Sequence, residues 1–105
     1  MAKNTGAKVM THYCEAGSQE KIQNHLISLL NKNGFPMRPL VTLCIGSDRY
    51  TGDALGPLIG SHLLEHTDSI VYGTLDSPVH AGNLIETIDI IARSHEHSVI
   101  LAVNA

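Results

Sequence analysis

The sequence has no cluster of Lys and Arg. Seven such residues are spread along 105 positions, against ten Asp and Glu, and the formal net charge is −3. A nucleic-acid interface depends on basic side chains gathered into a patch, so this distribution argues against nucleic acid as a partner. Hydrophobic residues make up 43% of the chain and charged residues 16%, as expected of one small globular domain or part of one.

Long apolar runs are absent as well, and cysteine is scarce. No run approaches the roughly 18 residues of a membrane span, and the start, Met-Ala-Lys-Asn-Thr-Gly, lacks the apolar core of a signal peptide. The two cysteines are Cys14, in a polar stretch, and Cys44, in an apolar one. Two unpatterned cysteines indicate a reducing compartment, and a buried structural thiol is expected at Cys44. We therefore expect a cytoplasmic protein with no membrane contact.

Motifs for metal and phosphate binding are also missing. His62 and His66 are four residues apart on an expected helix, but no Glu stands between them, so a solvated helix face is expected. The loop 46–53 has neither the Gly-x-Gly-x-x-Gly pattern nor the Gly-Lys-Ser/Thr ending of a P-loop. Asp48 and Asp53 in that loop would also repel phosphate. The residues alone therefore predict neither a metal site nor a nucleotide site.

What the sequence does contain is an alternation of helical and extended segments. After an arm over residues 1–17, the spacing predicts one α/β domain over 18–105, with helices at 18–34, 53–66 and 82–95 and strands at 40–45, 70–75 and 98–103. Ser18 is expected to cap the first helix. Apolar residues at helical spacing are expected to face inward, namely Leu55, Leu58, Ile59, Leu63 and Leu64 in the second helix and Leu84, Ile85, Ile88, Ile91 and Ala92 in the third. Strands that alternate with helices indicate parallel βαβ units.

The segment 40–57 passes from an expected strand through a glycine-containing loop into an expected helix. In parallel α/β sheets, ligands bind outside the carboxyl ends of the strands. The loop 46–53 lies there after the first strand and Asn104 lies there after the third, and we expect these two strand ends side by side. Asp53 is thus a candidate functional acid. Its alternative role is structural, since either Thr51 or Asp53 would also cap the following helix.

Three blocks of sequence carry a resemblance to known proteins. They are Cys-Ile-Gly-Ser-Asp-Arg-Tyr-Thr-Gly-Asp-Ala-Leu-Gly-Pro at 44–57, Tyr-Gly-Thr-Leu-Asp-Ser-Pro-Val-His-Ala-Gly-Asn-Leu at 72–84 and Ile-Leu-Ala-Val-Asn-Ala at 100–105. In this order and spacing they resemble the YyaC family of spore proteases. The Gly-Asp-Ala-Leu-Gly-Pro turn is more distantly similar to turns in the germination protease of spores and in hydrogenase maturation proteases. The resemblance implies a three-layer α/β sandwich of the phosphorylase/hydrolase-like type, of which this chain is an amino-terminal portion with a parallel βαβαβ core.

The resemblance also implies roles for single residues in hydrolysis of a peptide or protein substrate. Asp53 matches a catalytic acid of the germination protease and a metal ligand of the hydrogenase maturation proteases, so a divalent metal is one implied cofactor. Asn104 matches the second acid, and an amide cannot take up that acid's proton. Asp48, Thr51 and His80 are expected to contact the substrate or to orient the acid. For His80, a loop histidine bonded to the backbone is the alternative.

The departure at Asn104 keeps other functions open. A chain that lost the carboxylate pair would serve as a non-catalytic binding or assembly module, and an exposed apolar sheet edge would favour a homodimer. A truncated gene product is a third interpretation. The resemblance implies a sporulation setting, with the protein in the forespore or the mother cell.

Overall fold

The computed structural model describes residues 16–47 and 53–104. Along the chain the elements are α1 (Ser18–Lys32), β1 (Leu40–Ile45), α2 (Leu55–His66), β2 (Ile70–Tyr72), α3 (Leu84–Ser94) and β3 (Val99–Asn104). Contacts divide the chain into two compact units, Met1–Asn33 and Gly34–Ala105. The first unit contains α1, and the second contains the sheet. Of the expected arm over 1–17, only residues 16 and 17 are described. Cys14 lies outside the described residues.

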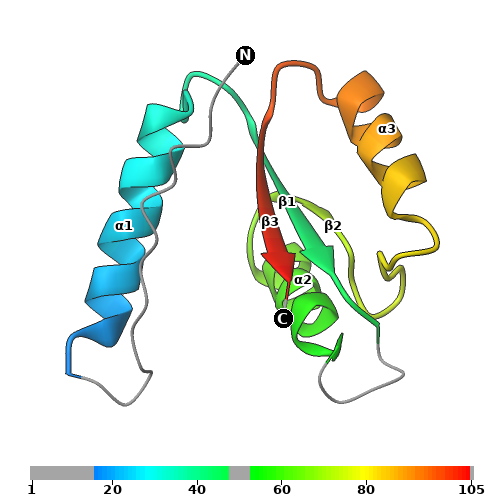
Figure 1. Cartoon of the computed structure of the whole chain (residues 1–105), viewed down its shortest axis with the longest axis horizontal. Helices are drawn as coiled ribbons and strands as arrows, with labels where there is room; N and C mark the ends of the chain where they lie inside the picture. Colours follow the sequence, from blue (N-terminus) through cyan, green and yellow to red (C-terminus); the bar gives the residue numbers. More distant parts are fainter. Residues whose placement is uncertain (1–15, 48–52, 105) are drawn as a thin grey trace. The chain divides into compact units, whose positions relative to one another are not determined.

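The second unit is built on a parallel sheet with the strand order β2-β1-β3. Strand β1 pairs with β2 from Val41 opposite Ile70 onward, and with β3 from Leu40 opposite Val99 onward. The arrowheads of β1 and β3 point to the same edge in Figure 1. The expected side-by-side position of these two strand ends is therefore confirmed, and β1 begins and ends at the predicted residues.

Helices lie on both faces of this sheet. Side chains alternate between the two faces along a strand. Val41 and Leu43 of β1 form one buried cluster with Ile91 of α3, whereas Cys44 faces α2, where a Cβ at Gly60 would lie 3.4 Å from the Cys44 Cβ. The predicted α/β fold with a parallel core is confirmed, and so is the burial of Cys44, which is fully buried as a free thiol.

Helix α2 packs on the sheet through glycines, and the predicted inward face is only partly correct, since Ile59 and Leu63 are half-buried but the other three predicted residues are not. Gly56, Pro57 and Gly60 are its buried residues. A Cβ at Gly56 would lie 2.3 Å from the Ile45 carbonyl oxygen, and one at Gly60 would lie 1.8 Å from the Gly73 carbonyl oxygen. At such close approach only hydrogen fits, so larger side chains are turned away. Leu55, Leu58 and Leu64 are consequently exposed.

Helix α3 also presents a different face from the one expected. Its buried residues are Thr87 and Ile91, and Leu84 packs against the core at its edge. Ile85 is 84% exposed, and Ile88 is exposed as well. The inward stripe is narrower than the apolar pattern, because α3 carries isoleucines on more than one side. Ile91 is the expected residue that does lie in the core.

Strand β2 ends at Tyr72, three residues earlier than predicted, because Gly73 turns the chain. Gly73 has φ +95, and a Cβ there would lie 1.8 Å from the Cys44 carbonyl oxygen. The Thr74 N–H then donates to the Ser77 carbonyl at 3.1 Å. The chain returns to the sheet at Val79, which forms an isolated parallel bridge with Ile45 and is buried. This return was not predicted from the sequence.

Helix α1 differs from the expected helix at both ends. Gly17, with φ 77, stands at the N-cap position of α1, so Ser18 lies inside the helix and does not cap it. The expected carboxyl end at residue 34 also shifts, since the helix stops at Lys32. There the Asn33 side-chain amide donates to the Leu29 carbonyl at 2.7 Å. The same carbonyl also accepts from the Asn33 backbone N–H at 3.2 Å, so Asn33 bonds it twice where the helix ends.

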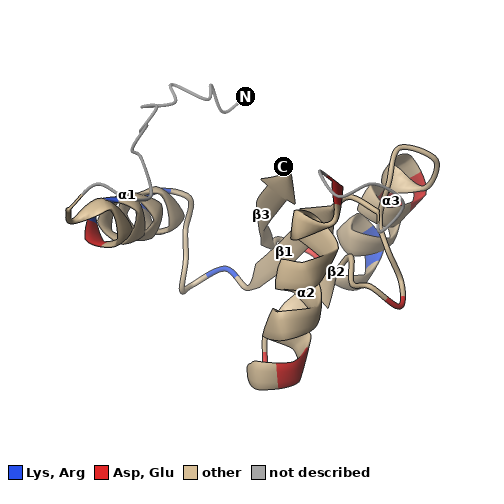
Figure 2. Ribbon diagram, turned by 90° about the horizontal axis from the view of Figure 1, so that it is seen from below, with Lys and Arg blue, Asp and Glu red and all other residues tan. Residues whose placement is uncertain are grey.

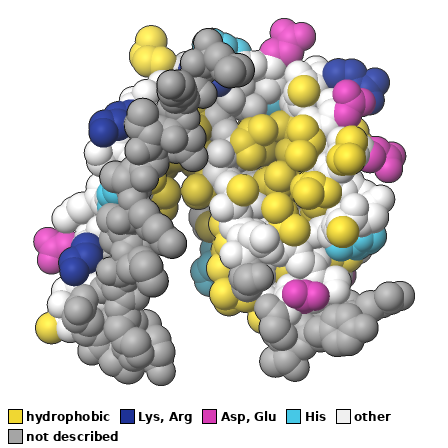
Figure 3. All heavy atoms as spheres, in the orientation of Figure 1, with side chains coloured by type: hydrophobic (Ala, Val, Ile, Leu, Met, Phe, Trp, Pro, Cys, Tyr) yellow, Lys and Arg dark blue, Asp and Glu magenta, His cyan; other side chains and the backbone are white. Residues whose placement is uncertain are grey.

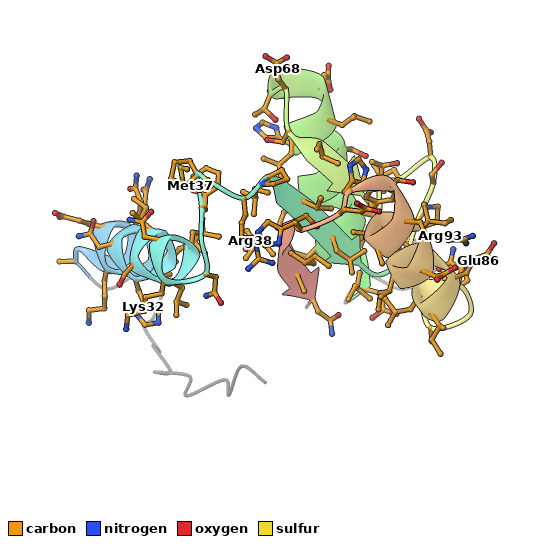
Figure 4. All side chains as sticks on the ribbon, turned by 90° about the horizontal axis from the view of Figure 1, so that it is seen from above. Lys32, Met37, Arg38, Asp68, Glu86 and Arg93 are labelled. Atoms are coloured by element: carbon orange, nitrogen blue, oxygen red, sulfur yellow. The ribbon has the colours of Figure 1, made fainter. Side chains whose placement is uncertain are left out.

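At the amino end of the strands, Arg38 joins two parts of the sheet unit. Its guanidinium donates to the carbonyls of His97 at 3.0 Å and Ser98 at 2.9 Å, directly before β3 (Figure 4). The Val99 N–H also donates to the Pro39 carbonyl at 2.7 Å. These bonds fix the start of β1 against the start of β3, so the parallel register is set before the strands run to the opposite edge.

Charged residues are few on the described ribbon and do not form a basic face on the sheet unit (Figure 2). His62 and His66 are exposed on α2 as predicted, with ring centroids 4.4 Å apart. Among the helices that the structure describes, none combines the length and apolarity needed to cross a bilayer.

Candidate functional site

The end of β1 is flanked on both sides by chemistry-bearing residues. Ile45 pairs with Asn104 of β3 on one side. On the other side it bridges to Val79, and the Gly46 N–H donates to the Val79 carbonyl at 2.8 Å. His80 directly follows Val79. Asn104 and His80 are therefore brought to the same edge of the sheet, with the end of β1 between them.

Asp53 is positioned over this edge by a backbone contact. A Cβ at Gly46 would lie 2.1 Å from the Asp53 carbonyl oxygen and 3.0 Å from Cδ of Pro57. Only glycine allows the chain to return so closely over the strand end. Asp53 is exposed and lies at the start of the turn that leads into α2. The three candidates Asp53, His80 and Asn104 thus share one edge.

The capping alternative for Asp53 is wrong for this helix. Ala54 is the N-cap residue of α2, and among the described residues no side chain makes a cap hydrogen bond to this helix. Pro57 lies in the first turn, where its missing N–H leaves no intrahelical bond unmade. The Asp53 carboxylate is therefore not engaged as the helix cap. Thr51, the other capping candidate, and Asp48 lie outside the described residues.

Asn104 lies inside the sheet and not after it. The sequence predicted that β3 would end at residue 103, but the strand runs from Val99 to Asn104, and Asn104 is its last residue. Strand pairing fixes its backbone, and its side chain is exposed. The amide is accordingly presented from a rigid element.

His80 belongs to a tight turn that Asn83 organises. The Asn83 side chain accepts from the His80 N–H at 2.8 Å and donates to the Pro78 carbonyl at 3.0 Å. The Gly82 N–H donates to Nδ1 of His80 at 3.1 Å. The backbone-bonded histidine that the sequence left as an alternative is therefore observed. The neutral ring consequently carries its proton on Nε2, and that N–H is the group left to meet a ligand.

Asn83 is a member of this arrangement that was not predicted from the sequence. Asn83 stands at the N-cap position of α3, yet its side chain bonds backward to residues 78 and 80 and does not cap the helix. An Asn directly after Gly82 and before an apolar helical segment was the available signal, because Asn side chains often bond nearby backbone in turns.

The described residues at this edge do not fit a metal centre. In the chain that the structure describes, no group of three His, Cys, Asp or Glu side chains comes together. The candidates described at this edge are one carboxylate, one imidazole and one amide, and an amide oxygen is a weaker ligand than the acid that the resemblance implies at 104. No metal-dependent reaction step is therefore assigned to this edge.

Comparison with known proteins identifies the family to which this chain belongs. A family model described as "Protein of unknown function (DUF1256)" matches residues 10–105. The chain belongs to the DUF1256 family. It is also 41% identical over 100 residues to "Uncharacterized protein YyaC" of Bacillus subtilis (strain 168), an alignment that covers 93% of this chain and 48% of that protein. The chain thus spans about half the length of this curated relative. No solved structure matches the chain.

Proposed function

We propose that the carboxyl edge of β1 is a peptide-hydrolysing site of the YyaC type, in which Asp53 is the general base. The observation that carries this proposal is the packing of the Asp53 backbone over Gly46, directly after the strand end that lies between Asn104 and the turn of His80. Its position after a parallel strand matches where α/β proteins place ligands. The similarity of the Asp-Ala-Leu-Gly-Pro turn to that of the germination protease supports the same role.

The chemistry follows from the groups present. The Asp53 carboxylate takes a proton from a water molecule, which attacks the carbonyl carbon of the scissile peptide. The amide of Asn104 and the Nε2–H of His80 donate to the substrate carbonyl oxygen, where negative charge develops. Asp53 then returns its proton to the leaving nitrogen. Asn104 cannot share a proton with Asp53, so turnover by the native chain is expected to be slow.

Exchange of single residues tests this assignment. Activity on a library of fluorescence-quenched peptides should rise by about tenfold or more in Asn104→Asp, because a second carboxyl group supplies acid catalysis. Adding Asp53→Asn to that variant should reduce the activity to background. The matched control is Asp68→Asn, since Asp68 is an exposed acid beyond α2, at the opposite edge of the sheet (Figure 4).

Activity in Asn104→Asp that persists after Asp53→Asn, or that falls equally with Asp68→Asn, would show that Asp53 is not the base. Absence of any hydrolysis in both the native chain and Asn104→Asp would reject the proposed reaction. Far-ultraviolet circular dichroism of each variant checks that the fold is kept.

A second candidate function is a non-catalytic assembly module. The observation that favours it is the apolar side chain exposed on the outermost strand, since Ile100 of β3 is 44% exposed. This function needs no second acid at position 104. Its test is the oligomeric state of the chain in solution.

A further inference from the structure

A groove of about 600 Å³ runs beside β2. This volume falls in the range of about 300–1,000 Å³ that is usual for ligand sites. Leu64 of α2 and Ile90 of α3 line it, together with Val71 of β2. The loop after β2 and the turn of His80 complete the groove with Thr74, Ser77 and Asn83, and Thr87 contributes from α3.

The groove follows an open strand edge. In the sheet of the described residues β2 is an outer strand, paired with β1 alone. Backbone N–H and C=O groups of a strand point to both sides, so those of β2 that point away from β1 meet no strand there. Such a row of groups is a template for another extended chain.

The side chains of the groove favour an uncharged occupant. Among the described residues, its lining contains no Lys, Arg, Asp or Glu, and His80 is the one imidazole there. The polar side chains of Thr74 and Thr87 are already bonded, Thr74 as acceptor from the Ser77 N–H and Thr87 as donor to the Asn83 carbonyl. Recognition would therefore come from backbone hydrogen bonds along β2 and from apolar contact with Leu64 and Ile90.

The groove also leads to the proposed site. His80 lines it, and the preceding Val79 both lines it and bridges to Ile45 at the end of β1. A chain lying along β2 would thus pass His80 on its way to the edge where Asp53 lies. Continuity of this kind is what a substrate groove of a peptide-hydrolysing site requires.

We infer that this groove binds an extended peptide segment with uncharged side chains, which adds to the outer edge of β2. The inference rests on the proposed function, because it supplies the substrate path for that site. Main-chain hydrogen bonds provide affinity in this mode of recognition, and pockets beside the strand provide side-chain preference.

The full chain is tested with a fluorescein-labelled, end-capped peptide of alternating Thr and Val, measured by fluorescence anisotropy. Arginine placed in the groove wall, in Leu64→Arg or Ile90→Arg, should weaken binding about tenfold or more, because a charge must then be desolvated. The matched controls are Leu58→Arg and Ile88→Arg. These residues lie on the same two helices and are similarly exposed, but they do not line the groove. The controls should bind as the native chain does.

A second probe tests the backbone contacts. The same peptide with N-methyl groups on alternate amides cannot donate those hydrogen bonds, so it should bind about tenfold more weakly or not at all. Equal binding of the two peptides would overturn the strand-addition inference, as would equal effects of the groove and control variants. A lack of saturable binding at millimolar peptide would also overturn it.

Failure of the groove and failure of the hydrolytic proposal give different results. Asp53→Asn should keep peptide binding while losing hydrolysis. Selective loss of binding in Leu64→Arg, without any hydrolysis by the native chain or Asn104→Asp, would support the groove and reject the reaction. Hydrolysis that depends on Asp53 but has the same KM in Leu64→Arg and Leu58→Arg would support the reaction and reject the groove.

Discussion

Cys44 shows how the environment of one residue sets its chemistry. Its side chain is fully buried between β1 and the glycines of α2. Burial raises the pKa of the thiol above its ordinary 9.0, because the thiolate would lose its hydration. A thiol kept protonated in this way is a poor nucleophile. Cys44 therefore belongs to the packing of the sheet and not to the chemistry at its edge.

The raised pKa makes stability depend on pH in a defined direction. Below the ordinary value the thiol is protonated in both the folded and the unfolded chain, so its contribution is constant. Above it the unfolded chain loses a proton that the folded chain keeps, so the free energy of unfolding falls as pH rises. We expect the native protein to lose up to about 1.4 kcal/mol per pH unit more than Cys44→Ala in this range.

Urea unfolding at a series of alkaline pH values measures this difference. All other side chains are the same in the two proteins, so the comparison isolates the contribution of Cys44. Parallel curves of unfolding free energy against pH for the two proteins would contradict the burial argument.

At the scale of elements, the contact between α2 and the sheet is made by backbone atoms. Gly56 and Gly60 place the helix against Ile45 and Gly73 without intervening side chains. Hydrophobic periodicity does not reveal such a contact, since it assumes that large apolar residues face the sheet. This is why β1, a continuous apolar run, was predicted to the residue, whereas the buried face of α2 was predicted only in part.

Gly60→Ala is expected to destabilise the chain by about 3 kcal/mol or more, because the added methyl group must displace the helix from the Gly73 carbonyl. His62→Ala, on the exposed side of the same helix, should change the unfolding free energy by less than about 0.5 kcal/mol. The midpoints of urea unfolding give both values. Equal midpoints for the two variants would show that the helix adjusts freely at Gly60.

The limits of hydrophobic periodicity also decide which parts of the candidate site could be predicted from the sequence. The meeting of β1 and β3 at one edge was predictable, because alternating helices and strands make parallel neighbours, and this brought the end of β1 next to Asn104. The bridge of Val79 was not predictable, since one residue of strand pairing has no period. The turn built by Asn83 was missed as well, although an Asn side chain that bonds nearby backbone is a local signal.

At the scale of the whole molecule, several large apolar side chains lie exposed on the surface of the sheet unit. Figure 3 shows hydrophobic side chains gathered on one face of this unit. Ile100 is exposed on β3, which is an outer strand of the sheet in the described chain. The sequence of β3, Val-Ile-Leu-Ala-Val-Asn, carries no charge or proline that would prevent pairing with another strand.

If the chain is an assembly module, two copies should associate through β3. Size-exclusion chromatography with light scattering should then show a dimer for the native chain and a monomer for Ile100→Lys, because a buried unpaired charge opposes association. Leu55→Lys is the control, since Leu55 is similarly exposed but lies on α2. A native chain that stays monomeric at all concentrations, or equal behaviour of both variants, counts against assembly.

The loop between β2 and Val79 can change in length and sequence during evolution without disturbing the sheet. Gly73 at one end packs on Cys44, and Val79 at the other end is bonded to Gly46, so both ends are fixed in the sheet. Lengthening a loop between fixed ends costs little, about 0.6 kcal/mol for each doubling of its length. Insertions and exchanges within 74–78 would remodel the wall beside β2 while His80 and Asp53 stay in place. The recognition of new ligands can therefore evolve here separately from whatever chemistry the strand ends perform.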